Sequence, residues 1–263
     1  MRNALEFARF KADGRKVSVV TAYDAWSARI VANSSVDAIL VGDSVAMVVH
    51  GHPTTLMATV DMMALHTAAV SRAAGGKFVI GDLPFLSYRK GLPAAMDAVG
   101  ALVTAGAHAV KLEGVDGHED IVKHIVGSGI PLMGHIGLMP QHVYEAGGYK
   151  VQGRSDEAVD RLVGEARTLE RLGAFAIVIE CVPAHVAERI TTAVSIPTIG
   201  IGAGVGTDGQ VLVLHDLLGL LPESGPRFVR QYMDGESIIT RALNAFDDDV
   251  KATRFPAAAE SYA

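Results

Sequence analysis

The segment "AILVGDS" (residues 38–44) is a short apolar run that ends on a charged residue, Asp43. Three further apolar runs carry charge in the same place: "FVIGDLP" (78–84), "AVKLEG" (109–114) and "FAIVIEC" (175–181). Burying an unpaired carboxylate costs several kcal/mol, so four such runs are not accidental. If the strands are parallel and each precedes a helix, these charges gather at one end of the sheet. That end is where α/β folds place their active sites.

Strand-like runs recur eight times along the chain. They cover residues 17–24, 38–44, 78–84, 109–114, 131–137, 175–182, 196–204 and 211–216. Helical patterns between them cover residues 59–72, 92–106, 155–173 and 183–194, and Ser155 has the position of a helix N-cap. The alternation predicts a closed α/β fold, a (β/α)₈ TIM barrel, with an open doubly wound sheet as the alternative.

Two regions depart from a regular repeat. Only about eight residues connect the last two strands, fewer than a parallel crossover usually needs, so we expect a single helical turn at 205–209. After the barrel we expect additional helices, from about residue 222 to 250, and then a loose tail, "FPAAAESYA". The whole chain, 1–263, is thus predicted to be a single barrel domain with a C-terminal extension.

Composition excludes several classes of function. The net charge of −6 disfavours nucleic-acid binding, which needs a basic surface. No apolar run reaches the roughly 18 residues of a membrane span, and the charged N-terminus does not resemble a signal peptide. The single cysteine, Cys181, allows no intrachain disulfide and fits a reducing compartment, so we expect a cytoplasmic protein with no membrane partner.

Side chains alternate between the two faces of a strand, which predicts where the charges point. Lys111 and Glu113 are two residues apart and share a face, while Leu112 between them faces the helices. The same alternation pairs Val41 with Asp43 and Val178 with Glu180. The charged residues expected in the barrel mouth are therefore Asp43, Asp82, Lys111, Glu113 and Glu180.

Carboxylates that lie within a few ångströms repel one another unless a cation intervenes. A divalent metal would resolve this, and ligands that are all oxygen atoms suit Mg²⁺ or Mn²⁺ better than zinc. The alternative is a buried ion-pair network in which Lys111 neutralises Glu113. Glu180 could be a further ligand, the partner of an arginine, or a general base. His135, at the end of the fifth strand, could reach the site or could be a satisfied core histidine.

Several long motifs resemble those of the ketopantoate hydroxymethyltransferase family. They are "TAYD", "VGDSVAMVVHGHPTT", "GDLPF", "VKLEG", "MGHIGLMPQ", "GGYKVQGR", "GAFAIVIECVP" and "IPTIGIGAGVGTDGQVLV". The similarity runs from about residue 11 to about residue 250. One small departure is Thr207, where many members of the family have a cysteine.

The resemblance implies a barrel related to the phosphoenolpyruvate mutase and isocitrate lyase group. It implies transfer of a hydroxymethyl group from 5,10-methylenetetrahydrofolate to 3-methyl-2-oxobutanoate, giving 2-dehydropantoate for pantothenate biosynthesis. A magnesium-stabilised enolate is the implied intermediate, and a homodecamer is the implied assembly.

The resemblance also implies roles for individual residues. The implied Mg²⁺ ligands are Asp43, Asp82 and Glu113. The implied binding residues for the 2-oxo acid are Asp43, Ser44, Asp82 and Lys111, with His135 lining the same pocket. Glu180 is the implied proton acceptor.

Three other functions remain open at this point. One is a metal-dependent carbon–carbon lyase of the same barrel group that acts on a small 2-oxo acid. Such enzymes often use a cysteine in a loop as the base, and this chain has no cysteine in such a loop. A second is a class I aldolase in which Lys111 forms a Schiff base. A third is a barrel that senses a 2-oxo acid without turnover.

Overall fold

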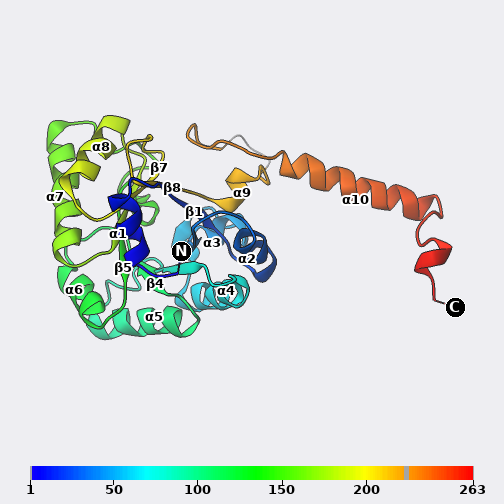
Figure 1. Ribbon diagram of the computed structural model, residues 1–263, viewed down its shortest axis with the longest axis horizontal. Helices are drawn as coiled ribbons and strands as arrows, with labels where there is room; N and C mark the ends of the chain where they lie inside the picture. Colours follow the sequence, from blue (N-terminus) through cyan, green and yellow to red (C-terminus); the bar gives the residue numbers. More distant parts are fainter. Residues whose placement is uncertain (1, 222–224, 263) are drawn as a thin grey trace. The chain divides into compact units, whose positions relative to one another are not determined.

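The computed structural model describes residues 2–221 and 225–262, and its first part contains a closed barrel (Figure 1). Each strand pairs in parallel with the next, and the last strand pairs with the first, in register Val17↔Gly209. The strands are Val17–Thr21 (β1), Ala38–Val41 (β2), Phe78–Asp82 (β3), Ala109–Lys111 (β4), Leu132–Gly137 (β5), Ala176–Glu180 (β6), Thr198–Ile201 (β7) and Gly209–Leu212 (β8). The predicted TIM barrel is confirmed, and the open sheet is excluded.

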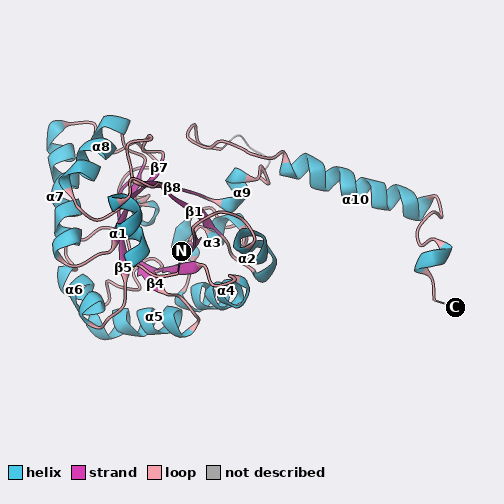
Figure 2. Cartoon of the chain, in the orientation of Figure 1, coloured by secondary structure: helices cyan, strands magenta, loops and turns pink. Residues whose placement is uncertain are grey.

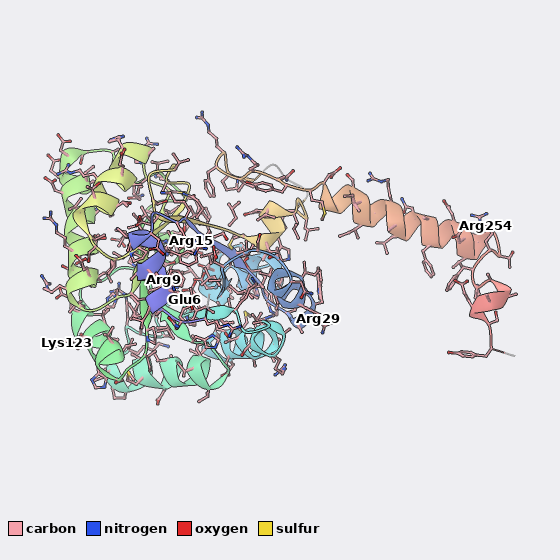
Figure 3. All side chains as sticks on the ribbon, in the orientation of Figure 1. Glu6, Arg9, Arg15, Arg29, Lys123 and Arg254 are labelled. Carbon is pink, nitrogen blue, oxygen red and sulfur yellow. The ribbon has the colours of Figure 1, made fainter. Side chains whose placement is uncertain are left out.

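Helices surround the strands of this barrel (Figure 2). They are Leu5–Ala12 (α1), Ala25–Ala32 (α2), Val45–Val48 (α3), Val60–Ala73 (α4), Leu92–Thr104 (α5), Glu119–Gly127 (α6), Asp156–Arg171 (α7) and Ala184–Ala193 (α8), with short 3₁₀ helices at Thr55–Met57 (η1) and Pro140–His142 (η2). Arg9, Arg29 and Lys123 illustrate the charge on the exposed faces of these helices (Figure 3). By contrast, most of the charged residues that the sequence placed in the barrel mouth have buried side chains.

Helix α1 closes the N-terminal end of the barrel. Its Phe7 is fully buried, and the ring contacts Phe78 at the start of β3 and Phe175 just before β6, with centroid distances of 5.7 and 5.0 Å. Lys11 connects this helix to the segment between α8 and β7, because its Nζ donates to the carbonyls of Val194 and Ile196 at 3.1 and 3.0 Å. Because apolar side chains fill this end of the barrel, a polar site can form only at the opposite end, where the carboxyl ends of the strands lie.

The helix signals in the sequence act as predicted. Ser155 caps α7, and its hydroxyl accepts a hydrogen bond from the Ala158 amide. Thr59 caps α4 in the same way through the Met62 amide. The predicted strands, by contrast, run past the observed strand ends, because the chain leaves the sheet at the charged residues. Asp43 and Glu113 each lie two residues beyond the last residue of β2 and β4.

The expected helical turn at 205–209 is wrong. The connection from β7 to β8 is a series of bends, and β8 begins at Gly209, two residues before the predicted start. In this connection, side chains make the hydrogen bonds to backbone groups that a helical turn would have made within the backbone. Thr207 Oγ1 donates to the Gly209 carbonyl at 2.8 Å, and Asp208 Oδ2 accepts from the Thr198 amide at 2.9 Å.

The chain divides into two compact units, Met1–Val213 and Leu214–Ala263. The second unit contains Leu214–Leu217 (α9), Gly235–Lys251 (α10) and a 3₁₀ helix at Ala258–Glu260 (η3). Extra helices after the barrel are thus confirmed, but the long one begins at 235 rather than near 222, and residues 222–224 lie outside the described residues. Single-domain organisation and a loose tail stay predictions. None of the helices in the described ranges is long and apolar enough to cross a membrane.

Gly137, the last residue of β5, supports the strand that carries Glu180. Its φ is +93°, and a Cβ there would lie 2.3 Å from the Glu180 carbonyl oxygen. We predict that Gly137→Ala lowers the free energy of unfolding by about 2 kcal/mol or more, from the positive φ and the forced displacement of β6. Urea denaturation measures the change.

Gly100 provides the matched control. It lies inside α5, and a Cβ added there would have no neighbouring atom within 4 Å. Gly100→Ala should therefore be neutral or stabilise the fold by up to about 1 kcal/mol. Equal effects of the two substitutions would contradict the role given to Gly137.

Candidate active site

The structure brings the predicted charges together at the carboxyl end of the barrel. Asp82, Lys111 and Glu180 are the last residues of β3, β4 and β6. Asp43 and Glu113 lie just beyond β2 and β4 and, like Asp82 and Lys111, are buried. The Glu180 side chain keeps 16% exposure, which leaves it accessible from the mouth.

Lys111 makes the shortest contact in this group. Its Nζ donates to Asp82 Oδ1 at 2.7 Å, so its direct partner is Asp82 and not Glu113, as the ion-pair alternative had assumed. The other oxygen of Asp82 accepts from the Asp43 amide at 3.3 Å. Three neighbouring strands are thereby connected through the two oxygens of one carboxylate.

His135 reaches the site from β5 and lies between two carboxylates. Its Nδ1 is 3.4 Å from Glu113 Oε1, and its Nε2 is 3.2 Å from Glu180 Oε2, although the latter two atoms are not aligned for a hydrogen bond. Burial and the nearby Lys111 would lower the pKa of His135, but the two glutamates outweigh them and raise it to about 9. This environment favours the protonated form of His135 between Glu113 and Glu180, and its Nδ1 also lies 3.4 Å from Lys111 Nζ.

Gln141 is the functional residue that sequence reasoning missed. This buried side chain in η2 donates from Nε2 to Asp43 Oδ2 at 2.9 Å and to the Leu83 carbonyl at 3.0 Å. Its backbone amide donates to Glu113 Oε2 at 3.0 Å. Tyr88 completes the network, with its hydroxyl 3.0 Å from Gln141 Oε1. The only signal available was the polar residue that ends the motif "MGHIGLMPQ" after the fifth strand.

Ser44 lies next to Asp43 and is half-buried. Its Oγ is 2.7 Å from the Tyr23 hydroxyl, and either atom can be the donor. The Ser44 hydroxyl can therefore donate to a ligand in the mouth while it accepts from Tyr23.

The cluster carries more negative charge than its cations balance. Burial, together with the charges of Asp82 and Glu113, raises the pKa of Asp43 well above its ordinary value. Burial also raises the pKa of Asp82, although Lys111 acts in the opposite direction. For Glu113, burial would raise the pKa, but the contacts with His135 and Lys111 lower it overall. Additional positive charge at this position would stabilise the ionised forms of Asp43 and Asp82.

The donor set fits a hard divalent cation. Protein donors hold both oxygens of Asp82 but only one oxygen each of Asp43 and Glu113, and Glu113 Oε1 accepts no hydrogen bond from the described residues. A buried carboxylate oxygen that accepts no hydrogen bond is costly, and coordination to a cation would satisfy it. Within residues 2–221 and 225–262, no group of three His, Cys, Asp or Glu side chains is already spaced to hold a metal, so binding would require the carboxylates to adjust.

The family model for ketopantoate hydroxymethyltransferase matches residues 2–258. The chain belongs to the ketopantoate hydroxymethyltransferase family. It is 54% identical over 262 residues to the 3-methyl-2-oxobutanoate hydroxymethyltransferase of Bdellovibrio bacteriovorus, and the alignment covers 100% of each chain. It is 53% identical over 255 residues to the protein of the same name in Coxiella burnetii (strain RSA 493 / Nine Mile phase I), covering 97% of this chain and 96% of the relative.

Solved structures with low identity support the barrel fold of this ketopantoate hydroxymethyltransferase family member. Phosphonopyruvate hydrolase, solved with oxalate and Mg²⁺, aligns with a TM-score of 0.66 at 10% identity, over 99% of this chain and 93% of that one. Phosphoenolpyruvate phosphomutase from Streptomyces platensis subsp. rosaceus aligns with a TM-score of 0.65 at 13% identity, over 95% and 88%. The family and the enzyme class predicted from the motifs are confirmed, and the solved structures agree with the barrel fold.

The position of His135 predicts how stability depends on pH. A pKa raised from about 6.5 to about 9 stabilises the folded state fully below pH 6.5, and that contribution is lost as the pH rises through 9. In metal-free protein with EDTA, we expect the free energy of unfolding to fall by about 2–3 kcal/mol between pH 6.5 and pH 9.5. In His135→Gln, most of this decrease in the free energy of unfolding with rising pH (the pH slope) should be absent.

A control histidine lies on the exposed face of α6. His124→Gln should leave the slope between pH 6.5 and pH 9.5 as it is in the natural chain. An unchanged slope in His135→Gln would mean that His135 is neutral in the folded protein.

Proposed function

We propose that the chain transfers a hydroxymethyl group from 5,10-methylenetetrahydrofolate to 3-methyl-2-oxobutanoate and releases 2-dehydropantoate in pantothenate biosynthesis. The observation that carries the proposal is the pairing of an accessible acid, Glu180, with a buried ammonium, Lys111, in one mouth. The full-length relatives that share more than half of the sequence bear the name of this enzyme.

We propose Mg²⁺ as the resident cation, held by Asp43, Asp82 and Glu113. The support is the surplus of buried negative charge and the Glu113 Oε1 atom, which accepts no hydrogen bond from the described residues. When bound, such a cation stabilises negative charge that develops on the oxygens of a 2-oxo acid. The all-oxygen donor set favours Mg²⁺ or Mn²⁺ over zinc.

The protein's own groups then account for the proton transfer. Glu180 accepts the proton from C3 of 3-methyl-2-oxobutanoate, and the electron pair of that bond moves towards the keto oxygen to give an enolate. His135 Nε2 lies 3.2 Å from Glu180 Oε2, so a protonated His135 stabilises the Glu180 carboxylate by charge. Lys111 pairs with the carboxylate of the 2-oxo acid, and the Ser44 hydroxyl donates a hydrogen bond to the substrate.

The transfer balances with one molecule of water. C3 of the enolate forms a carbon–carbon bond to the methylene carbon, and both bonds from that carbon to the folate nitrogens break. Water supplies the hydroxyl oxygen. The proton from C3 and one proton from water end on the two nitrogens, so tetrahydrofolate leaves.

The aldolase alternative is disfavoured by the state of Lys111. Burial would lower the pKa of the ammonium, but Asp82, Glu113 and Asp43 together raise it. A Schiff base requires a neutral amine, and this environment stabilises the charged form. The lyase alternative lacks a cysteine base in a mouth loop, since Cys181 is the single cysteine of the chain.

The base assignment predicts the outcome of an exchange experiment. Glu180→Gln should slow exchange of the C3 proton of 3-methyl-2-oxobutanoate in D₂O, without folate, by about 10²–10⁴-fold. Affinity for the 2-oxo acid should change much less, because Lys111 still pairs with its carboxylate. Proton NMR follows both the exchange and the binding.

Glu188→Gln, on the exposed face of α8, is the matched control and should exchange at the natural rate. Exchange at the natural rate in Glu180→Gln as well would assign the base to another residue, with His135 the first candidate. Loss of binding would give Glu180 a structural or ligand role.

We also propose a homodecamer that resides in the cytoplasm. Trp26 and Ile30 on α2 and Leu65 on α4 are all more than half exposed, and a cluster of exposed large apolar side chains commonly marks an interface. Light scattering at micromolar concentration should give ten times the mass of one chain. A monomer would contradict the proposal, and Trp26→Lys should weaken the assembly if this patch is part of an interface.

A further inference from the structure

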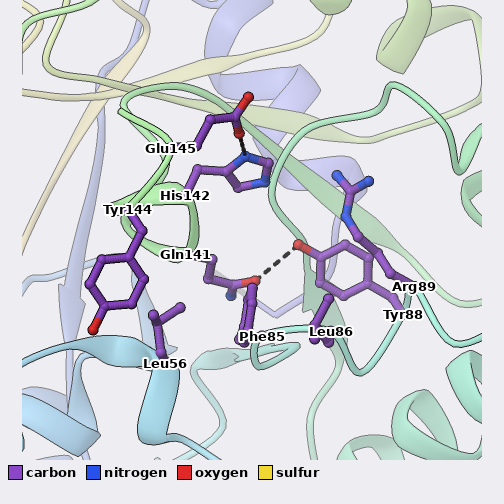
Figure 4. Close-up of a pocket in the computed structure, with 9 residues that line it drawn as sticks. All are labelled: Leu56, Phe85, Leu86, Tyr88, Arg89, Gln141, His142, Tyr144 and Glu145. Carbon is purple, nitrogen blue, oxygen red and sulfur yellow. Dashed lines mark hydrogen bonds and ion pairs between the residues drawn. The ribbon is translucent and has the colours of Figure 1, made fainter. Parts of the chain in front are cut away.

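A cavity of about 280 Å³ lies directly beside the carboxylate cluster (Figure 4). Three loops at the carboxyl end of the barrel form it: the segment containing η1, the connection from β3 to α5, and the connection from β5 to α7. Its lining residues are Leu56, Phe85, Leu86, Tyr88, Arg89, Gln141, His142, Tyr144 and Glu145. None of the roles assigned above requires this cavity.

Gln141 and Tyr88 separate the cavity from the site. Gln141 lines the cavity and also donates to Asp43 Oδ2 at 2.9 Å. Only the Gln141 side chain therefore lies between the cavity and the Asp43 carboxylate. Tyr88 lines it too, while its hydroxyl donates to the Glu113 carbonyl at 3.1 Å. A ligand with one end in the mouth can therefore place a neighbouring group in this cavity.

The walls suit a flat aromatic ring. Figure 4 shows Tyr144 and Leu56 on one side and Tyr88 on the other, with Gln141 between them. Phe85 and Leu86 add apolar surface, and both are more than a third exposed. Aromatic and aliphatic walls of this kind bind rings by stacking and apolar contact.

Arg89 at the edge of the cavity is available to an anion. Its Nη1 donates to the Asp116 carbonyl at 3.3 Å, and the guanidinium lies 5.7 Å from the centre of the Tyr88 ring. No carboxylate among the described residues forms an ion pair with it. The acid that lines the cavity, Glu145, is paired instead with His142 Nδ1 at 2.9 Å. An arginine has five N–H donors, so Arg89 can still bind a carboxylate through several of them.

We infer that this cavity binds the p-aminobenzoylglutamate part of 5,10-methylenetetrahydrofolate, with the benzoyl ring against Phe85, Leu86 and Tyr144 and a glutamate carboxylate on Arg89. The inference rests on the proposed function. The reacting methylene is bonded to the nitrogen of the p-aminobenzoyl group, so that group lies next to the mouth during transfer. The cavity is too small for the whole cofactor, and it has the apolar walls and cationic edge that an aryl amide with a carboxylate needs.

The test compares two one-carbon donors, 5,10-methylenetetrahydrofolate and the primary amide of 5,10-methylenetetrahydropteroate (the pteroyl amide), which has neither the glutamate nor a free carboxylate. Arg89→Gln should raise the KM for the folate about 10- to 100-fold, the usual loss for a charge-assisted hydrogen bond. The KM for the pteroyl amide should change by less than about threefold, because that donor has no carboxylate for Arg89 to bind. Lys90→Gln, a neighbouring exposed cation that does not line the cavity, should change neither value.

A second variant tests the ring contact. Tyr144→Ala should raise the KM for both donors by a similar factor, since both carry the benzoyl ring. Exchange of the C3 proton without folate is measured on every preparation, which separates an altered folate subsite from a damaged barrel. If Arg89→Gln changes the KM for both donors equally, or for neither, the inference is wrong.

A failure of the proposed function gives a different result. In that case the natural chain forms no product from either donor. Calorimetry with p-aminobenzoylglutamate alone then tests the cavity directly, and binding that Arg89→Gln weakens would support the subsite independently of turnover. Absence of binding to the natural chain would overturn it.

Discussion

The repulsion among Asp43, Asp82 and Glu113 is the constraint on which the mouth of this barrel depends. Three buried carboxylates within reach of one another need compensating donors and positive charge. Lys111 supplies the charge to Asp82, and Gln141 supplies hydrogen bonds to the other two. These donors each hold one carboxylate oxygen, and the arrangement leaves Glu113 Oε1 without a hydrogen-bond partner among the described residues. This oxygen supports the proposal that the cluster receives a cation and argues against a closed ion-pair network.

The rest of the fold makes this concentration of charge possible. Helix α1 fills the N-terminal end with aromatic side chains, so that the barrel interior below the site is apolar and close-packed. Short strands end at the charged residues, which places side chains from β3, β4 and β6 around one opening. The site residues lie on or just beyond rigid strands, whereas the neighbouring cavity is formed by loops. This division matches an activity with a fixed reaction centre and a larger, more adaptable co-substrate subsite.

The residues at strand ends were predictable from the sequence, because the alternation of a strand fixes the face of each side chain. Asp82, Lys111 and Glu180 follow that rule directly, and the contact between His135 and Glu180 follows from adjacent strands. Gln141 and Tyr88 were not predictable, since loop geometry has no fixed period. The helical turn expected before β8 failed for a related reason: side chains of Thr207 and Asp208 satisfy the backbone there. The identity of the catalysed reaction was inferred from the long sequence motifs, because hydrophobic periodicity carries no information about the substrate.

The most direct test of the account is the position of a bound cation. Crystals of the chain with Mn²⁺ and 3-methyl-2-oxobutanoate should show an anomalous peak coordinated by Asp43, Asp82 and Glu113, with the 2-oxo acid between that peak and Glu180. The Glu113 Oε1 atom, which accepts no hydrogen bond from the described residues, should become a ligand or accept from a coordinating water. A 2-oxo acid bound to Lys111 with no anomalous peak among the three carboxylates would contradict the account.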